Sequence, residues 1–168
     1  MNKQKGFSLI ELLIVVAIIL IIAAIAIPNL LSARKSANES SAVGSLRTLN
    51  TAEVSFQGKH NAYTGTLADM GPAGDNYIDA NLAGATAAGT AKSGYFFQPG
   101  AMGPAIAIPP AIGPVTTPVV SYEWSGSPAN LGVTGNQAFC TDTSAVIWKD
   151  VNGVGATCLA NNPRVPIG

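Results

Sequence analysis

The chain has 168 residues, which is room for one modest domain together with an extended segment. Charged side chains make up only 11% of the sequence, and nine basic residues balance nine acidic ones. This composition gives no electrostatic case for a nucleic-acid platform, which needs clustered lysine and arginine, so we expect no nucleic-acid partner.

The first predicted element is an apolar helix over residues 7–27. At 1.5 Å per residue this segment spans about 31 Å, which is enough to cross a bilayer. Lys3 and Lys5 precede the segment, and no comparable basic cluster follows until Arg34 and Lys35. A short basic leader stays on the cytoplasmic side, so we expect the C-terminal part of the chain outside the inner membrane.

Glu11 places a carboxylate inside this apolar segment. Such a group costs roughly 2.5–3.5 kcal/mol on insertion scales, and charged residues in spanning helices usually mark function. The apolar segment itself offers almost no cationic partner. A cut between Gly6 and Phe7 would create an α-amine four residues from Glu11. The partner of the carboxylate could then be the N-terminus of this chain or of an identical neighbour.

The stretch KGFSLIEL, which runs from Lys5 to Leu12, resembles the processing site of type IV pilins and type II secretion pseudopilins. In that family a prepilin peptidase cuts after the glycine and methylates the new N-terminal phenylalanine. The resemblance implies that cleavage follows Gly6, that Phe7 is the methylated mature N-terminus, and that Glu11 acts in assembly. Pro28 also lies where members of the family commonly have a helix-disturbing proline.

A second helical pattern follows from Leu31 to Phe56. Its apolar residues recur every three or four positions, at Val43, Leu46, Leu49, Ala52 and Phe56. This spacing is typical of an amphipathic helix that buries one stripe, so the two segments together predict one helix of about 50 residues. Pro28 has no backbone N–H to donate, and we expect a kink or local weakness near residues 24–28.

Short strands are predicted beyond the helix. A helical turn is expected within residues 63–72, a mobile surface loop over residues 83–94, and a proline-rich loop over residues 99–118. The strand candidates are Tyr95–Gln98, Val119–Trp124, Gln137–Cys140 and Ala145–Lys149. Four short strands cannot cover both faces of a sheet. We therefore expect an α+β fold, in which a small four-stranded antiparallel sheet packs on the amphipathic half of the long helix.

These elements divide the chain into four parts. Residues 1–6 are expected to be a removed leader, residues 7–28 a transmembrane and filament-core helix, residues 29–57 an amphipathic helix, and residues 58–168 a globular pilin domain.

Two cysteines, Cys140 and Cys158, suit the oxidising side of the membrane. Their disulfide would close a loop of about 18 residues and contribute on the order of 3 kcal/mol in the chain-entropy account. Two free thiols are the alternative.

The sequence shows no catalytic or metal-binding constellation. His60 is the only histidine, and nothing near it completes a catalytic triad, so we expect it to be solvated. One histidine and two distant cysteines make a poor zinc set. Residues 150–153 faintly resemble a calcium loop but lack its spaced carboxylates, so a tight turn is expected there. We expect neither enzyme activity nor a cofactor.

The resemblance implies a structural subunit of a type IV pilus. Its partners would be identical subunits, the prepilin peptidase, and the assembly platform of the inner membrane. The subunit would be stored in that membrane and then built into an extracellular filament that serves adhesion, twitching motility or DNA uptake. The alternative within the family is a minor pilin or a pseudopilin of a type II secretion system. The sequence lacks the acidic calcium-binding loop that is usual in the major pseudopilin.

Two alternatives lie outside the family. A membrane-anchored binding protein would keep its leader uncut. A secreted soluble protein, an enzyme included, would be cut near residues 24–26, where Ala-Ile-Ala resembles a signal peptidase site. The length of the apolar segment and the charge of Glu11 weigh against secretion.

Overall fold

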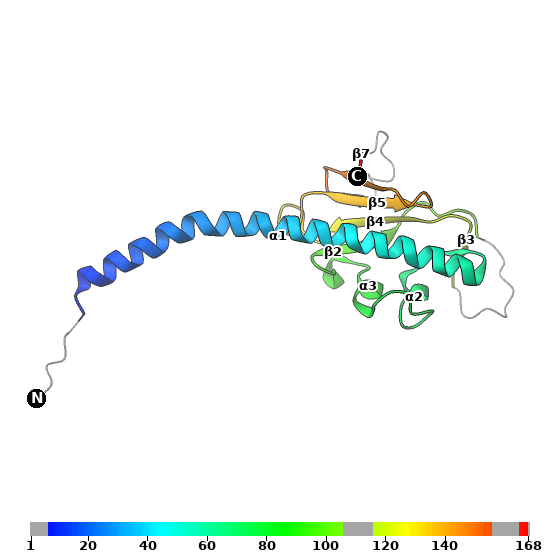
Figure 1. Ribbon diagram of the computed structural model, residues 1–168, viewed down its shortest axis with the longest axis horizontal. Coiled ribbons are helices and arrows are strands. Elements are labelled where there is room, and N and C mark those ends of the chain that lie inside the picture. Colours follow the sequence, from blue (N-terminus) through cyan, green and yellow to red (C-terminus); the bar gives the residue numbers. More distant parts are fainter. Residues whose placement is uncertain (1–6, 106–115, 156–164, 168) are drawn as a thin grey trace, which may run out of the picture. The chain divides into compact units, whose positions relative to one another are not determined.

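The computed structural model describes residues 7–105, 116–155 and 165–167. The chain falls into two compact units that meet between Arg34 and Lys35. A single long helix, α1 (Leu9–His60), contributes to both units, as the blue-to-green ribbon of Figure 1 shows. It ends where Asn61 adopts a positive φ of 57°, a conformation that asparagine tolerates better than most residues.

The first unit consists of the apolar part of α1. Every large apolar side chain from Phe7 to Leu31 is exposed. Among the described residues, α1 is the one helix long and apolar enough to cross a membrane. Pro28 lies inside this helix, which continues through it. The kink expected near residues 24–28 stays a prediction.

The second unit is built on the other half of α1. The buried stripe expected there is confirmed at Leu46, Leu49, Ala52 and Phe56, while Val43 is half-buried. These side chains join buried residues of the strands and short helices in one hydrophobic core. Burial of a side chain of this size contributes roughly 1.5–3 kcal/mol, so the stripe is a principal anchor of the fold.

An antiparallel sheet packs on this half of α1. In the described residues its order is β2-β4-β5-β6-β7. The strands are β2 (Tyr95–Pro99), β4 (Glu123–Pro128), β5 (Ala138–Asp142), β6 (Ile147–Asp150) and β7 (Val165–Pro166). The α+β prediction is confirmed, and the sheet has one strand more than expected. The extra strand, β7, has only two residues and contains a proline, so it carries no alternating pattern by which the sequence could reveal it.

The strand predicted over Val119–Trp124 is divided in the structure. Its first part belongs to β3 (Pro118–Val119), which pairs with β1 (Tyr63–Thr64) in a separate two-stranded sheet. The next residues bond to a loop instead, since Val120 N–H donates to the Pro104 carbonyl at 3.2 Å. Only from Glu123 does the chain pair with β2 and β5. The change of partner along the chain is what interrupts the strand.

Short helices occupy much of the connection between α1 and β2. The helical turn expected within residues 63–72 is α2 (Leu67–Met70). The segment predicted as a loop over residues 83–94 contains the end of α3 (Ala80–Gly84) and a 3-10 turn, η1 (Ala88–Thr90). Ala85 of this segment is buried, and its carbonyl accepts from Phe97 N–H at 2.7 Å. The loop prediction is therefore wrong for this part of the segment.

Candidate functional site

Glu11 lies in the first turn of α1, where its carboxylate meets the start of the helix. The backbone N–H of Ser8 donates to Glu11 Oε2 at 3.0 Å. The first N–H groups of a helix have no partner within the helix, and a glutamate three residues after the capping residue can reach back to satisfy one of them. Ser8 and Glu11 have the spacing of such a capping box. This signal is present in the sequence and was missed.

The other residues predicted to act in processing lie at the edge of the described chain. Phe7 is described, and its side chain is exposed. Gly6 and the rest of the leader lie outside the described residues, as does Cys158. Cys140 is fully buried on β5. The cleavage site and the Cys140–Cys158 disulfide therefore stay predictions.

Asn50 is a buried polar residue on the face of α1 that packs on the sheet. Its side-chain amide donates to Thr141 Oγ1 at 2.9 Å and to the Ala145 carbonyl at 3.2 Å. Its Oδ1 accepts from the Tyr122 hydroxyl at 3.2 Å. Buried polar groups are costly unless they are hydrogen-bonded, so these contacts fix which part of the helix faces the sheet.

Glu53 is fully buried one turn further along the same face. Trp124 Nε1 donates to its Oε1 at 2.8 Å, and Thr64 N–H donates to its Oε2 at 3.1 Å. Burial raises the pKa of Glu53 to about 7, because desolvation and the nearby Asp69 outweigh the two hydrogen bonds. No local pattern in the sequence predicts this role for Glu53.

Asp69 is a second buried carboxyl group, on α2. The Thr64 hydroxyl donates to Asp69 Oδ2 at 2.8 Å, and the Thr116 N–H donates to the same oxygen at 3.1 Å. Thr64 therefore contacts Glu53 through its backbone and Asp69 through its side chain. This arrangement connects α2 and the segment just before β3 to α1.

His60 is not solvated, and that prediction is wrong. Its side chain is only 2% exposed, and its ring lies against Phe56 with the ring centroids 4.3 Å apart. Its Nε2 lies 2.5 Å from Asp75 Oδ2, and Lys59 forms an ion pair with the same carboxylate. Partial burial raises the pKa of Asp75, but the hydrogen bonds from Lys59 and His60 outweigh it and hold that pKa below its usual 3.8.

The tight turn expected over residues 150–153 is confirmed. Asn152 N–H donates to Asp150 Oδ1 at 2.7 Å, and Gly153 has a φ of 71°. In the part of the chain that the structure describes, no three histidine, cysteine or acidic residues are grouped so that they could hold a metal ion.

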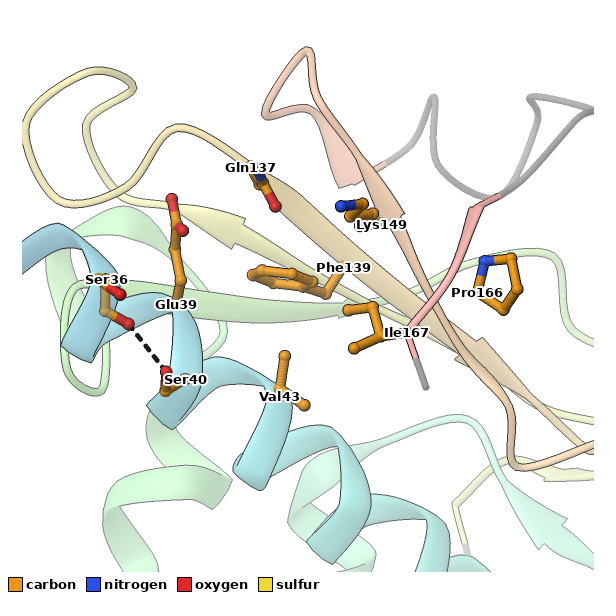
Figure 2. A pocket seen from close by; sticks show the side chains of 9 residues that line it. All are labelled: Ser36, Glu39, Ser40, Val43, Gln137, Phe139, Lys149, Pro166 and Ile167. Carbon is orange, nitrogen blue, oxygen red and sulfur yellow. Dashed lines mark hydrogen bonds between the residues drawn. The ribbon is translucent and has the colours of Figure 1, made fainter.

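A pocket of about 350 Å³ lies between α1 and the sheet. Figure 2 shows Val43, Phe139 and Ile167 close together in it, with Glu39 and Lys149 also among its lining residues. Glu39 is hydrogen-bonded to the loop that precedes β5, since its Oε1 accepts from Asn136 N–H at 2.8 Å.

The chain resembles known proteins over part of its length. Residues 1–27 match the family described as the prokaryotic N-terminal methylation motif. The type IV major pilin protein PilA of Myxococcus xanthus is 44% identical over 69 residues, which cover 41% of the chain and 31% of that protein. The type II secretion system core protein G of Escherichia coli is 28% identical over 94 residues, which cover 56% of the chain and 62% of that protein. No solved structure matches significantly.

One of these relatives is similar over more than two thirds of its own length. The type IV wide pilus major component PilA4 of Thermus thermophilus is 41% identical over 93 residues, which cover 55% of the chain and 71% of that protein. This similarity agrees with the methylation motif at the N-terminus and with the fold, a long helix packed on an antiparallel sheet. The chain therefore belongs to the type IV pilin family.

Proposed function

We propose that the chain is a structural subunit of a type IV pilus and polymerises through its apolar N-terminal helix. The exposed apolar surface from Phe7 to Leu31 is the observation that carries this proposal. A surface of that extent needs lipid or other protein around it. In a family that includes pilus components, the helices of identical subunits are the natural cover.

Assembly would move this helix from lipid into a bundle of identical helices. The hydrophobic gain in that step is small, because lipid is as apolar as the bundle. Close packing of leucine, isoleucine, valine and alanine side chains, together with polar pairing, must then supply the specificity. The isoleucine-rich surface of α1 is suited to such packing.

Glu11 would supply the polar pairing. After cleavage behind Gly6, the methylated α-amine of Phe7 would approach the Glu11 carboxylate of an adjacent subunit. Each charge would be costly alone in the apolar bundle, so the pair would fix the register between subunits. The Ser8–Glu11 hydrogen bond supports this role, because it holds the carboxylate beside the N-terminus.

The proposal also assigns a role to each segment of the chain. The leader would be residues 1–6, the filament-core helix residues 7–28, the amphipathic helix residues 29–57, and the outer domain residues 58–168 with its Cys140–Cys158 disulfide. The prepilin peptidase and an inner-membrane assembly platform would be its partners. The subunit would be stored in the inner membrane with its C-terminus outside, and the filament would serve attachment, motility or DNA uptake. No enzymatic role is proposed.

A pseudopilin of a type II secretion system is the second candidate. It is favoured by the similarity to core protein G, which extends over 94 residues. The two pilus proteins are more similar to the chain, at 41% and 44% identity, and favour the pilus.

The test is the intact mass and N-terminal sequence of the chain in two fractions of the cells that make it: material sheared from the surface, and membranes. An abundant sheared chain that begins at methylated Phe7 would support the pilus. A processed chain confined to membranes would favour the pseudopilin or a minor pilin. A chain that keeps its leader, or one that begins near Ile27, would overturn both.

A further inference from the structure

The larger sheet ends in the strands β2 and β7, and each of these edge strands contains one proline. Pro99 is the last residue of β2, and Pro166 is the last residue of β7. An edge strand presents backbone N–H and C=O groups on which a strand of another chain can pair. Proline has no N–H to offer, so its effect depends on whether its position faces the sheet or the open edge.

Pro166 occupies an outward-facing position of β7. The residue after it, Ile167, donates its N–H to the Ile147 carbonyl at 2.8 Å, at the start of β6. Successive residues of an antiparallel strand direct their backbone groups alternately toward one neighbour and away from it. Ile167 faces β6, and Pro166 therefore faces away from β6. Val165 is 51% exposed and Pro166 is exposed as well, so this edge is open to solvent in the described part of the chain.

Pro99 has the same orientation on the opposite edge of the sheet. The N–H of Phe97 donates to the Ala85 carbonyl at 2.7 Å, on the side away from β4. The N–H of Tyr95 donates to the Lys92 carbonyl at 3.0 Å. By the alternation along the strand, position 99 faces the same way as positions 95 and 97. The outward N–H groups of β2 are thus bonded within the domain, or absent at Pro99.

In the described strands, neither edge of this sheet offers an unbonded N–H group on its outer side. The carbonyls of Pro99 and Pro166 point outward, but a carbonyl can only accept. Antiparallel strands pair by exchanging N–H···O bonds in both directions. Two such edges therefore lack the donors with which they could pair with each other.

We infer that Pro99 and Pro166 close the two edges of the sheet against strand pairing with a second copy of the chain. Copies that lie side by side must then meet through side chains, and the sheet does not continue from one copy into the next. This closure belongs to the folded unit that begins at Lys35 and needs neither leader cleavage nor polymerisation through the apolar helix. Failure of the proposed function would thus leave it standing.

The experiment restores the missing N–H with Pro166→Thr in the full chain, purified in detergent micelles. Threonine is favoured in strands, and its N–H at this position would point outward. Two copies could then exchange a pair of hydrogen bonds at position 166 across a twofold axis. Two such bonds should raise the association constant of the chain by roughly 5- to 150-fold. Sedimentation equilibrium in density-matched detergent measures this constant.

Pro72→Thr is the matched control, because Pro72 is exposed and lies between α2 and α3, outside the sheet. Its association constant should equal that of the parent chain. Equal constants in Pro166→Thr and Pro72→Thr would overturn the inference.

Hydrogen exchange tests the orientation of the position without any association. In dilute Pro166→Thr the new N–H should exchange about as fast as an amide in an unfolded peptide, because it faces solvent. Protection of that N–H in the dilute protein would show that it faces the domain and would contradict the inference. Pro99→Thr allows the same two measurements at β2 and covers the case in which Pro166→Thr does not fold.

Discussion

The backbone N–H of Ser8 and the Oε2 atom of Glu11 are hydrogen-bonded at 3.0 Å across the first turn of α1. Glu11 therefore has a local partner as well as the partner proposed in a neighbouring subunit. The local bond requires only an acceptor, whereas pairing with an α-amine requires a negative charge. This difference allows the two roles to be separated by substitution.

Glu11→Val should insert into the membrane but give few or no filaments, because the α-amine of the neighbouring subunit would be buried without a counter-charge. Glu11→Gln is the informative companion, since glutamine can still cap the helix but carries no charge. Filament yield is measured in cells without a wild-type copy. If charge pairing drives assembly, both variants should lose filaments. A normal filament yield from Glu11→Gln would mean that Glu11 acts only as a helix cap.

Gly6→Glu should block removal of the leader, because the cleavage site resembles one that has a glycine before the cut. The intact mass of the membrane-bound chain would then retain residues 1–6. Gly58→Glu is the control, because a Cβ atom added at that position would meet nothing within 4 Å. Normal cleavage of Gly6→Glu would mean that the processing site is assigned wrongly.

Reduction should destabilise the protein if Cys140 and Cys158 are linked. The expected loss is on the order of 3 kcal/mol for a loop of about 18 residues. It is measured by denaturant unfolding with and without reductant. Cys158→Ser should show the same loss and no further response to reductant. It is a better variant than a change at Cys140, whose full burial would add a separate packing effect. A wild-type protein indifferent to reductant would instead indicate free thiols.

Asp75→Asn should lower the free energy of unfolding at neutral pH, because Lys59 and His60 would lose their common carboxylate. The pKa of Asp75 lies below 3.8 in the folded protein, so its contribution is present above that value and is lost as the pH falls through the native pKa. The difference in the free energy of unfolding between Asp75→Asn and wild type should therefore become smaller in strong acid. Urea unfolding at several pH values measures it.

Lys59→Gln is the comparison for that variant. It should have a smaller effect than Asp75→Asn, because the Lys59 side chain is half exposed and the His60 contact remains. Equal stability of Asp75→Asn and wild type at neutral pH would show that the cluster does not stabilise the fold.

The sequence alone was sufficient to predict the long helix, its buried stripe and most of the sheet. These features depend on periodicity within one segment. The sequence was insufficient to predict the buried hydrogen bonds of Glu53 and Asn50, which occupy the same helix face as the apolar residues. Their partners, such as Trp124 and Thr141, lie far along the chain, and no local pattern reveals such pairs. His60 had a local signal, since it follows the buried Phe56 by four residues and so shares its face.

The hydrogen bonds of Asn50 and Glu53 also have a mechanical consequence. A pull along α1 would have to shear the helix past the sheet, because bonds from these two residues join it to Thr141 and Trp124. Several such bonds would bear the load side by side and would have to break together. A slip by one helical turn, about 5.4 Å, would leave both polar groups without partners. Tension on the helix would thus be passed to the domain as a whole, and the helix would not slide out of it.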